Sequence, residues 1–579
     1  MRTFINIAIL IIFILSNQIA SPIYAYQKQS TLRPQNAAAS TASDVSASLA
    51  TQEPSIQINR FDASSYEPIN PFLINMLNRF KRAQGFLNLD QASFRNIANP
   101  HQIFKGAVFA ETAGRHRQVL SYRIKHNVAL GPGGGGMRYI TTSELPSDDI
   151  HFRRNPDYPI ELEILNVNSL QQAEAFVDRW VFEETLALAM GMTLKNASVN
   201  LELGGAKGSV LLASVIQRDR KFYLVPLSSA SPLDDIMLVA RITRDWARQM
   251  RLHGIVGINK DKPAADINTT NNPARPQVNI IAWHADEDQE VLFEQGFYEH
   301  SHPILHQRLR AIHDSGLRGD DEIHLMGTLY LQAVADYVKE TGIAVEELGT
   351  YTSKPVSLGG SEVRAYSTAL GMRITTEHLM KKIYAKSAKY EKPIQGTTCA
   401  IQGFGNAGKN AFDLMSEAGS KVLAVSEYGT AIYRAEGLND VKKEILDIVR
   451  HTGTLRSCVG KIPGVEIIEN ADNLLYLDVD ILVLAAKEDV LTEENADRVK
   501  ARIVSEPANG AINMAADIIL AVNGIKVFHD SLVSAGGVIV SQYERIQNIR
   551  GEHWTENVIV DMLTRQLCES ADAIYEISQ

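Results

Sequence analysis

The sequence predicts an α/β protein of two domains with a cleft between them, and three observations lead to this prediction. The chain has 579 residues, enough for two large domains or about four smaller ones. Its last third alternates short β-rich segments with helical patterns, which is typical of a doubly wound parallel sheet. The part before it mixes helices and strands without that alternation. We therefore expect an N-terminal mixed α/β domain followed by a doubly wound domain.

The composition excludes several classes of protein. Hydrophobic residues make up 45% of the chain and charged residues 21%, close to the globular average, which excludes a disordered or fibrous protein. The net charge of −10 lacks the basic excess of a nucleic-acid-binding protein, so we expect small-molecule partners. The three scattered cysteines predict buried or free thiols, with neither a disulfide framework nor a thiolate metal site; they are Cys399, Cys458 and Cys568.

The N-terminus resembles a secretory signal. Arg2 precedes the apolar run 4–15, and small or polar residues follow as far as Ala25, which is the layout of a cleaved signal peptide. An uncleaved membrane anchor or a misassigned start codon would leave the same pattern. Residues 26–55 are rich in Ser, Ala, Thr and Gln and are expected to form a disordered linker after this signal-like segment of residues 1–25.

Three parts are expected beyond the linker. Residues 56–366 are predicted to form the first domain, with a helical insertion at about 287–347. The doubly wound domain is predicted at 367–545, and a C-terminal helical segment at 546–579.

Apolar residues at helical spacing predict the main helices of the first domain. They lie at 170–194 and 234–251, and a mainly helical stretch follows at 286–347. Three tryptophans in such patterns are expected in the core; they are Trp180, Trp246 and Trp283. Four histidines of the last stretch could bind a metal, but exposed helix positions are the preferred interpretation; they are His300, His302, His306 and His313.

The last third contains the alternation that predicts the doubly wound sheet. The expected strands are 398–402, 421–426, 480–484, 502–505 and 525–528. The helical patterns between several of them are 407–418, 441–451 and 493–502.

A glycine-rich segment joins the first of these strands to the first helix. It reads G-F-G-N-A-G, in which glycines allow a tight turn and backbone N–H groups approach a pyrophosphate; its candidate cofactor residues are Gly403, Gly405, Asn406, Ala407 and Gly408. Glu427 ends the next strand, near the expected position of an acid that binds the ribose hydroxyls. Because a carboxylate repels a 2′-phosphate, we expect a Rossmann-like domain that binds NAD, with NADP less favoured. A structural glycine turn is the alternative.

Two lysines and one aspartate of the first domain are candidates for chemistry. Lys195 and Lys207 follow the segment 131–138, whose glycines predict a loop that approaches a ligand closely. A charged lysine can bind a carboxylate and a neutral one can act as a general base, whereas two solvated surface lysines are the alternative. Asp266 lies in the segment 262–270, expected to be a rigid turn in which it presents its carboxylate or caps the turn.

Eight ordered segments resemble the Glu/Leu/Phe/Val dehydrogenase family, the amino-acid dehydrogenases that include glutamate dehydrogenase. The resemblance runs from about residue 70 to 563. The segments are SYRIKHNVALGPGGGGMR, GMTLKNASVNLELGGAKGS, KPAADINTT, KPVSLGGSEVRAYSTALG, IQGFGNAG, VDILVLAA, EPANGAI and SAGGVIVSQYERIQN. Chance agreement over so many ordered segments is negligible.

The resemblance implies roles for residues of both domains. Lys207 resembles the catalytic lysine of the family, and Lys195 resembles the lysine that binds the substrate α-carboxylate. Asp266 resembles the acid that carries protons to and from the amino group. Thr368 resembles the threonine at the nicotinamide amide, and Asn509 resembles a residue near the nicotinamide ribose.

The residues expected around a substrate side chain give conflicting indications. Glutamate-specific members carry, at the position of Gly134, a lysine that pairs with the side-chain carboxylate, and leucine- and phenylalanine-type members carry an apolar residue there. Met192 also resembles the latter enzymes. Ser541, by contrast, matches a serine that glutamate enzymes use at that carboxylate, and Arg364 matches a recurrent arginine. If no other basic residue reaches the pocket, we expect apolar amino acids to be handled as well as glutamate or better.

The resemblance implies an enzyme that reversibly deaminates an L-amino acid of glutamate type to a 2-oxo acid and ammonium, with NAD as oxidant. The alternatives are a leucine-, valine- or phenylalanine-type dehydrogenase and a catalytically inactive NAD-binding relative. A homo-oligomer, often a hexamer, is implied as well. The location stays open, because the signal-like N-terminus favours export or membrane tethering while NAD chemistry favours an intracellular or organelle compartment.

Overall fold

The computed structural model describes residues 55–57, 61–112, 115–127, 130–142, 145, 150–227, 232–265, 280–317, 327–384 and 393–578. The predicted signal-like segment and all but the last residue of the predicted linker lie outside these ranges. Ser55, that last residue, already belongs to strand β1 (Ser55–Gln57). Within the described ranges, none of the helices combines the length and the apolar character that a membrane span requires.

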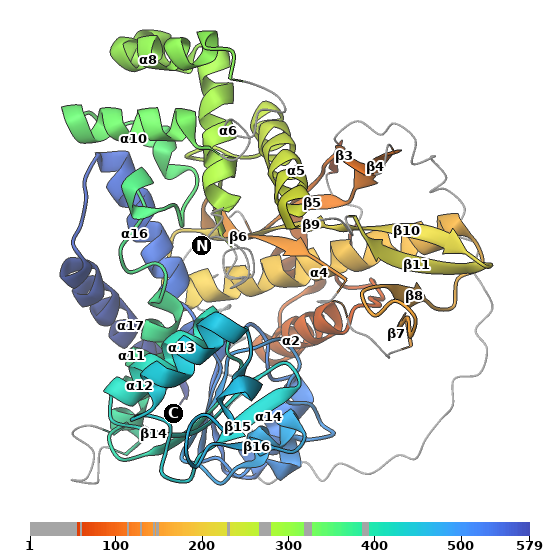
Figure 1. The fold of residues 1–579 in the computed structure, drawn as a ribbon, viewed down its shortest axis with the longest axis vertical. Helices are drawn as coiled ribbons and strands as arrows, with labels where there is room; N and C mark the ends of the chain where they lie inside the picture. Colours follow the sequence, from red (N-terminus) through yellow and green to blue (C-terminus); the bar gives the residue numbers. More distant parts are fainter. Residues whose placement is uncertain are drawn as a thin grey trace.

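A mixed sheet forms the centre of the first domain (Figure 1), and its strand order is β1-β2-β5-β9-β6-β12. The strands after β1 are β2 (Pro100–Lys105), β5 (Ser121–His126), β9 (Gly204–Leu211), β6 (Gly133–Ile140) and β12 (Asp261–Ala265). The pairs β9–β6 and β6–β12 are parallel, and the other pairs are antiparallel.

Two expectations for this sheet are wrong. The glycine-rich segment 131–138 was expected to be a loop, but from Gly133 onward it is strand β6. Its glycines allow close approach to a neighbouring strand, because a Cβ on Gly135 would lie 1.7 Å from the backbone oxygen of Ala206 in β9. The start of the expected turn at 262–270 is likewise strand β12, while residues 266–270 lie outside the described residues.

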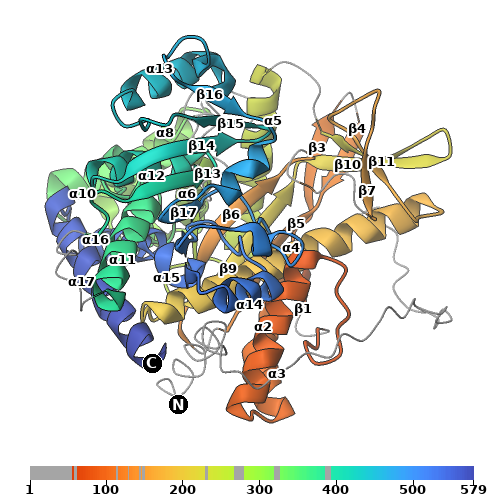
Figure 2. The same cartoon turned by 90° about the horizontal axis from the view of Figure 1, so that it is seen from below.

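Long helices pack on this sheet. α4 (Leu170–Ser198) begins at the N-cap Ser169, whose hydroxyl accepts from the backbone N–H of Gln172, and it runs along the sheet (Figure 2). It is buried on nearly all sides over its middle turns, which explains its apolar sequence. The other helices here are α2 (Pro71–Leu87), α3 (Gln91–Ala98) and α5 (Pro232–Leu252). The predicted helices at 170–194 and 234–251 are confirmed.

Two smaller β structures complete this part. A four-stranded antiparallel sheet has the order β10-β11-β8-β7, and a hairpin pairs β3 with β4. Their bounds are β10 (Ala213–Arg218), β11 (Lys221–Pro226), β8 (Leu162–Ile164), β7 (Phe152–Arg154), β3 (Val108–Thr112) and β4 (Arg115–Val119).

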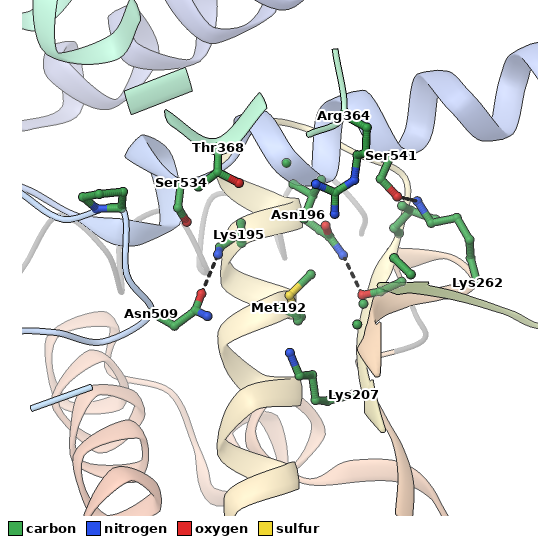
Figure 3. Close-up of a pocket in the computed structure, with 18 residues that line it drawn as sticks. Met192, Lys195, Asn196, Lys207, Lys262, Arg364, Thr368, Asn509, Ser534 and Ser541 are labelled. Carbon is green, nitrogen blue, oxygen red and sulfur yellow. Dashed lines mark hydrogen bonds between the residues drawn. The ribbon is translucent and has the colours of Figure 1, made fainter. Parts of the chain in front are cut away.

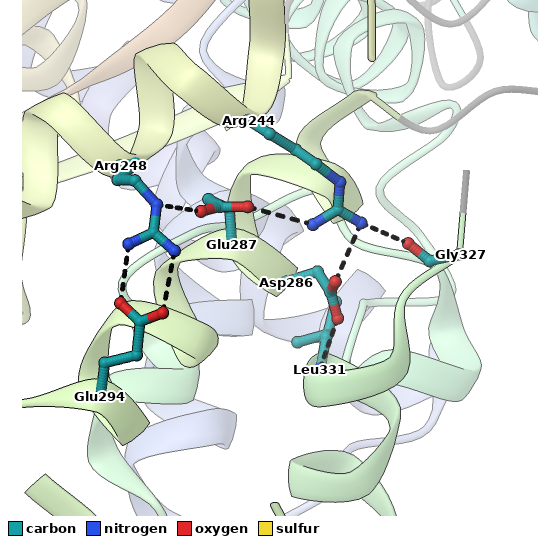
Figure 4. A network of polar contacts seen from close by, with 7 residues as sticks. All are labelled: Arg244, Arg248, Asp286, Glu287, Glu294, Gly327 and Leu331. Atoms are coloured by element: carbon teal, nitrogen blue, oxygen red, sulfur yellow. Dashed lines mark hydrogen bonds and ion pairs between the residues drawn. The ribbon is translucent and has the colours of Figure 1, made fainter. Parts of the chain in front are cut away.

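The stretch predicted to be mainly helical is helical over most of its described residues. It contains α6 (Ile280–Glu294), α7 (Phe297–Ser301), α8 (Pro303–Asp314), α10 (Leu329–Thr341) and the 3-10 turns η3 (Glu346–Gly349) and η4 (Val356–Leu358). Ion pairs hold α6 against α5 (Figure 4). Arg244 forms buried pairs with Asp286 and Glu287, and the more exposed Arg248 pairs with Glu287 and Glu294.

The second domain is built on a Rossmann-like sheet with the order β16-β15-β14-β13-β17-β18-β19. Its strands are β13 (Thr398–Gln402), β14 (Lys421–Glu427), β15 (Thr430–Tyr433), β16 (Glu466–Ile468), β17 (Ile481–Leu484), β18 (Ile503–Ser505) and β19 (Lys526–Phe528). The five strands predicted from the sequence are confirmed and pair in parallel. The sequence analysis missed β15 and β16, which extend the sheet in antiparallel fashion.

Helices and 3-10 turns connect these strands and close the domain. They are α11 (Ser367–Ile383), α12 (Asn406–Glu417), α13 (Lys442–Thr452), η5 (Leu455–Cys458), η6 (Ala471–Tyr476), η7 (Ala496–Arg498), α14 (Met514–Val522), α15 (Asp530–Val533), α16 (Gly536–Arg550) and α17 (Glu556–Ser578).

The predicted helix at 493–502 is wrong, since only the short turn η7 forms there. The side chain of Asn495 accepts from the backbone N–H of Thr492 and donates to the backbone oxygen of Val490. Such bonds from a side chain to nearby backbone stabilise a loop in place of a helix.

The two domains meet through α2, through the C-terminal end of α4 and through α16. On the α2 side two hydrogen bonds join the domains: Arg79 donates to the backbone oxygen of Ile512 at 2.7 Å, and Asn75 accepts from the backbone N–H of Met514 at 3.2 Å. α16 instead buries Ile539 and Val540 in the core of the second domain while it packs against η3 of the first.

The remaining sequence predictions concern isolated side chains. Trp180, Trp246 and Trp283 are buried, as predicted, and the three cysteines are free thiols, with Cys399 and Cys458 buried. Among the described residues, no group of three or more His, Cys, Asp or Glu side chains could hold a metal ion.

Candidate active site

A cavity lies between the two domains, and Figure 3 shows the side chains that line it. Its empty volume, which includes space open to solvent, is about 680 Å³, a size suited to a small ligand. No acidic residue occurs among its described lining residues, whereas four are basic: Lys195, Lys207, Lys262 and Arg364. The cavity therefore favours an anionic ligand.

Lys195 comes from the last turn of α4 and is only 7% exposed. Its ammonium donates to the Oδ1 atom of Asn509 at 2.7 Å, so this hydrogen bond joins the first domain to the loop after β18. Met192 lies three residues earlier on α4 and lines the same cavity, because residues at i and i+3 share one helix face. The structure thus brings together three residues that the sequence analysis selected from distant parts of the chain.

Lys207 projects from β9 into the same cavity and is 4% exposed. The alternative that Lys195 and Lys207 are solvated surface lysines is therefore excluded. Asp266, the third candidate, lies outside the described residues, although the strand β12 that leads to it ends at the cavity through Ala264.

Lys262 is a cavity residue to which the sequence analysis assigned no role. It is 4% exposed, and its ammonium donates to the Ser541 hydroxyl at 3.1 Å. Burial lowers the pKa of Lys262 to about 7, and the nearby cations Arg545 and Arg364 act in the same direction. In strand β12 the side chain of Lys262 lies on the same side as Ala264 and opposite Asp261, but the sequence analysis expected a turn at this segment and therefore missed it.

The residues expected around the substrate side chain also line this cavity. Gly134 does so on β6, and Ser541 does so on α16, with Thr368 and Arg364 close to the start of α11. The expectation drawn from Gly134 depended on no other basic residue reaching the pocket. That condition is not met, because Lys262 and Arg364 line the cavity with it.

The glycine-rich turn between β13 and α12 has the shape that a dinucleotide requires. Gly403 has a φ of 101°, a conformation that favours glycine. A Cβ on Gly408 would lie 1.9 Å from the Gly403 oxygen, whereas a Cβ on Gly405 would meet no heavy atom within 4 Å. The first and third glycines thus allow the tight turn and close helix packing, and the second leaves the N-terminus of α12 open to a pyrophosphate.

The position of this turn in the sheet supports the same interpretation. β13 lies between β14 and β17, so the strand order reverses beside it, which is where doubly wound sheets bind ligands. Asn406 ties the turn to the segment before α11 by donating to the backbone oxygen of Ala365 at 2.9 Å, and Ala407 continues the first turn of α12. The described residues therefore fit a dinucleotide.

Glu427 ends β14, as predicted. Its Oε1 atom accepts from the backbone N–H of Leu455 at 2.7 Å and from the Thr454 hydroxyl. These bonds hold the carboxylate at the carboxyl end of the sheet, next to the glycine-rich turn.

Similarity to known proteins agrees with the site. The family model described as Glutamate/Leucine/Phenylalanine/Valine dehydrogenase matches residues 359–579. A glutamate dehydrogenase of Aeropyrum pernix is 29% identical over 499 residues, covering 86% of this chain and 88% of that protein. An NAD-specific glutamate dehydrogenase of Staphylococcus aureus is 30% identical over 501 residues, covering 86% of this chain and 90% of that protein.

Solved structures share the fold. A hetero-hexameric glutamate dehydrogenase from Thermus thermophilus, in a Leu-bound form, aligns with a TM-score of 0.60 at 21% identity, covering 88% of this chain and 91% of that one. A glutamate dehydrogenase from Peptoniphilus asaccharolyticus aligns with a TM-score of 0.54 at 23% identity, covering 88% and 92%. With the ordered motifs, the two-domain fold and a 30% identical relative matched over nine-tenths of its length, the chain belongs to the Glu/Leu/Phe/Val dehydrogenase family.

Proposed function

We propose that the protein catalyses the reversible, NAD-dependent oxidative deamination of L-glutamate to 2-oxoglutarate and ammonium. The observation that carries this proposal is the cavity between the domains, in which three lysines and an arginine converge and no described lining residue is acidic. A dicarboxylic amino acid offers two carboxylates to these cations. The relatives named as glutamate dehydrogenases support the same substrate class.

Within this proposal the residues of the first domain carry the chemistry of the substrate. Lys195 binds the α-carboxylate, and Lys207 activates the water that attacks the iminium carbon formed when hydride leaves Cα. Asp266, outside the described residues, carries protons to and from the nitrogen. Because Lys195 and Lys207 are both buried, their interactions with a bound substrate are strengthened by exclusion of water.

The second domain is proposed to hold NAD, which accepts the hydride when bound. Gly403, Gly405 and Gly408 shape the turn for the pyrophosphate, with Asn406 and Ala407 at the start of α12. Thr368 and Asn509 line the cavity from the second domain and are proposed at the nicotinamide end. Glu427 is proposed to bind the ribose hydroxyls and to favour NAD over NADP by repelling a 2′-phosphate.

The two alternatives are less well supported. A leucine-, valine- or phenylalanine-type substrate would leave the buried ammonium of Lys262 facing an apolar side chain, which is costly for a buried charge. A catalytically inactive relative would have no need to keep both Lys195 and Lys207 buried at one cavity.

A homo-oligomer, possibly a hexamer, is part of the proposal. The family resemblance supports it, and the aligned Thermus thermophilus enzyme is described as a hetero-hexamer. Light scattering coupled to size exclusion would measure the mass of the purified assembly, and a monomer would contradict this part.

A substrate panel tests the proposed function directly. Formation of reduced nicotinamide is followed with NAD⁺ or NADP⁺ and with L-glutamate, leucine, valine or phenylalanine. We expect kcat/KM for glutamate to be at least about 100-fold above that of the apolar amino acids, since unpaired buried charges cost several kcal/mol. Preference for an apolar amino acid would support that alternative, and no turnover of any amino acid would support the inactive relative.

A further inference from the structure

The proposed function leaves open which side chain of this chain binds the distal carboxylate of a dicarboxylic substrate. Gly134 carries no side chain for this purpose. Lys262 is the buried lysine nearest to it in the strand register, and its described hydrogen-bond partner is the neutral hydroxyl of Ser541. Among the described residues, no carboxylate forms an ion pair with Lys262.

The alternation of strand β12 directs Lys262 into the cavity. Successive side chains of a strand point to opposite sides. Asp261 accepts two hydrogen bonds from the buried guanidinium of Arg123, each at 2.8 Å. The carboxylate of Asp261 is therefore neutralised by Arg123 on the face of β12 opposite Lys262. Lys262 and Ala264 both line the cavity. The charge of Lys262 is thus placed at the ligand site while its neighbour is neutralised within the sheet.

The register between β6 and β12 places Lys262 beside Gly134. The two strands are parallel, and Lys262 is the Cα partner of Gly134. Directly paired residues of neighbouring strands lie on the same face, with the strands about 4.8 Å apart. The Cβ that Gly134 lacks would approach Leu203 and Asn196, which line the same cavity. A lysine side chain on β12 can therefore reach the same part of the cavity as a lysine side chain at position 134 of β6 would.

Ser541 supplies a second donor at the same place. It is 3% exposed on α16, and its hydroxyl also lies 2.7 Å from the Thr352 hydroxyl. The ammonium of Lys262 and this hydroxyl together can donate to the two oxygens of one carboxylate. Figure 3 shows Lys262 and Ser541 at one side of the cavity and Lys195 with Asn509 at the opposite side. The two ends can therefore bind the two carboxylates of one substrate.

We propose that Lys262, assisted by Ser541, is the specificity-determining residue that binds the distal carboxylate of a dicarboxylic amino acid or 2-oxo acid. This inference rests on the proposed function and adds to it the position of the cation. In this chain the positive charge for the distal carboxylate then comes from β12, whereas a lysine at position 134 would supply it from β6. Glutamate specificity therefore does not require a lysine at position 134.

The test compares two substrates that differ at one group. L-Norvaline has a methyl group where L-glutamate has its distal carboxylate. In Lys262→Met we expect kcat/KM for glutamate to fall at least about 30-fold, mainly through KM, because a buried charge loses its partner. Norvaline turnover should change less than threefold. Equal losses on both substrates, or a selective loss below 30-fold, would overturn the proposal.

A matched control and a binding measurement keep the test independent of turnover. Lys260→Met removes an exposed lysine two residues away and should leave both substrates unaffected. Calorimetry with reduced cofactor compares glutarate with pentanoate, which have no amino group to react. The wild type should prefer glutarate at least about 30-fold, and Lys262→Met should prefer it less than threefold.

The outcomes separate this inference from the proposed function. A wild type that turns over no amino acid would refute the proposed function, and the glutarate comparison would still decide the role of Lys262. A wild type that deaminates glutamate, with Lys262→Met still preferring glutarate as strongly, would refute Lys262 alone. A thermal melt of each variant confirms that it is folded.

Discussion

The interface of α5 with α6 and the cavity between the domains both bury charges, but they pair them differently. At the interface, Arg244 donates to Asp286 at 3.0 Å and to Glu287 at 3.3 Å, and to the backbone oxygen of Gly327 at 2.7 Å (Figure 4). In the cavity, Lys262 donates to a neutral hydroxyl at 3.1 Å. The first cation is neutralised by the protein, whereas the second is not neutralised by any described carboxylate.

This difference separates structural charges from ligand-binding charges. A cation that the protein pairs with two carboxylates fixes the arrangement of two helices but has little attraction left for a ligand. Burial is costly even there, since it raises the pKa of Asp286 to about 6 despite the Arg244 partner. A buried cation beside a hydroxyl lowers the stability of the folded protein, and an anionic ligand can supply the opposite charge that it lacks; such a loss of stability for function is common at binding sites.

The largest expected effect concerns the cavity. Lys207→Ala should lower kcat/KM by about 1,000-fold or more, because general acid–base groups contribute about 10²–10⁴-fold. Binding of NADH, followed by its fluorescence, should stay within threefold, since the dinucleotide turn lies in the other domain. Asp266→Asn should behave alike, because an amide cannot accept the proton. Lys221→Ala, an exposed lysine of β11, serves as control, and a Lys207→Ala enzyme with more than a tenth of wild-type activity would refute the assigned role.

Substitutions at the interface of α5 with α6 should lower the stability of the protein and leave its activity unchanged. Arg244→Met leaves the buried Asp286 without its cation and Glu287 with Arg248 alone, and it should lower the free energy of unfolding by about 3–5 kcal/mol, with kcat per folded molecule unchanged. Arg308→Met, which breaks the more exposed pair with Glu340, should cost less than about 1 kcal/mol. Chemical denaturation measures both, and equal losses would show that the buried pairs have no special structural role.

Lys262→Met should stabilise the protein while it impairs glutamate binding. The pKa of Lys262 is lowered from 10.5 to about 7 on folding, by burial first and by Arg545 and Arg364, with Glu544 and Asp261 acting against this. Between these two pH values the unfolded state binds more protons than the folded state, so the wild type gains stability as pH rises, by up to about 1.4 kcal/mol per pH unit.

The methionine variant lacks this dependence. Its advantage over the wild type should be greatest below pH 7, on the order of a few kcal/mol, and should shrink as pH rises toward 10.5. Melting temperatures from pH 6 to pH 10 measure the difference between the two proteins. A variant less stable than the wild type at pH 6 would show that Lys262 is a stabilising structural residue.

Substitution of Glu427 should have the smallest effect. Its carboxylate lies between the two cases above, because it is partly paired by the backbone N–H of Leu455. Glu427→Ser should raise the ratio of kcat/KM for NADP to that for NAD at least about tenfold, equivalent to about 1.4 kcal/mol, since repulsion of the 2′-phosphate is removed. Initial rates with both cofactors measure this ratio. An unchanged ratio would mean that Glu427 only anchors the loop at Leu455.

Much of the second domain could be predicted from the sequence because its signals are local. Short apolar strands, the glycine turn at 403–408 and the acid Glu427 each lie within a few residues of the features that identify them. β15 and β16 were missed because they are short and form only by pairing with the edge of the sheet. The helix expected at 493–502 failed because side-chain bonds of Asn495 compete with helical backbone bonds.

The role of Lys262 could not be predicted, because it depends on contacts between distant parts of the chain. The role of Lys262 follows from its strand pairing with Gly134 in β6 and from its hydrogen bond with Ser541 on α16. Pro263 also favoured a turn in place of a strand. β12 tolerates this proline because it is the edge strand of its sheet, where a missing N–H does not interrupt the ladder.

The contrast between the α2 and α16 contacts has a consequence for how the enzyme exchanges its ligands. Water can replace the hydrogen bonds of Asn75 and Arg79 with Met514 and Ile512 at a net cost of about 1 kcal/mol each. Separating α16 from the second domain would instead expose Ile539 and Val540, which are fully buried. The cleft should therefore open on the α2 side by rotation about α16, which stays packed in the second domain while its Glu544 keeps the buried ion pair with Lys354 of the first domain.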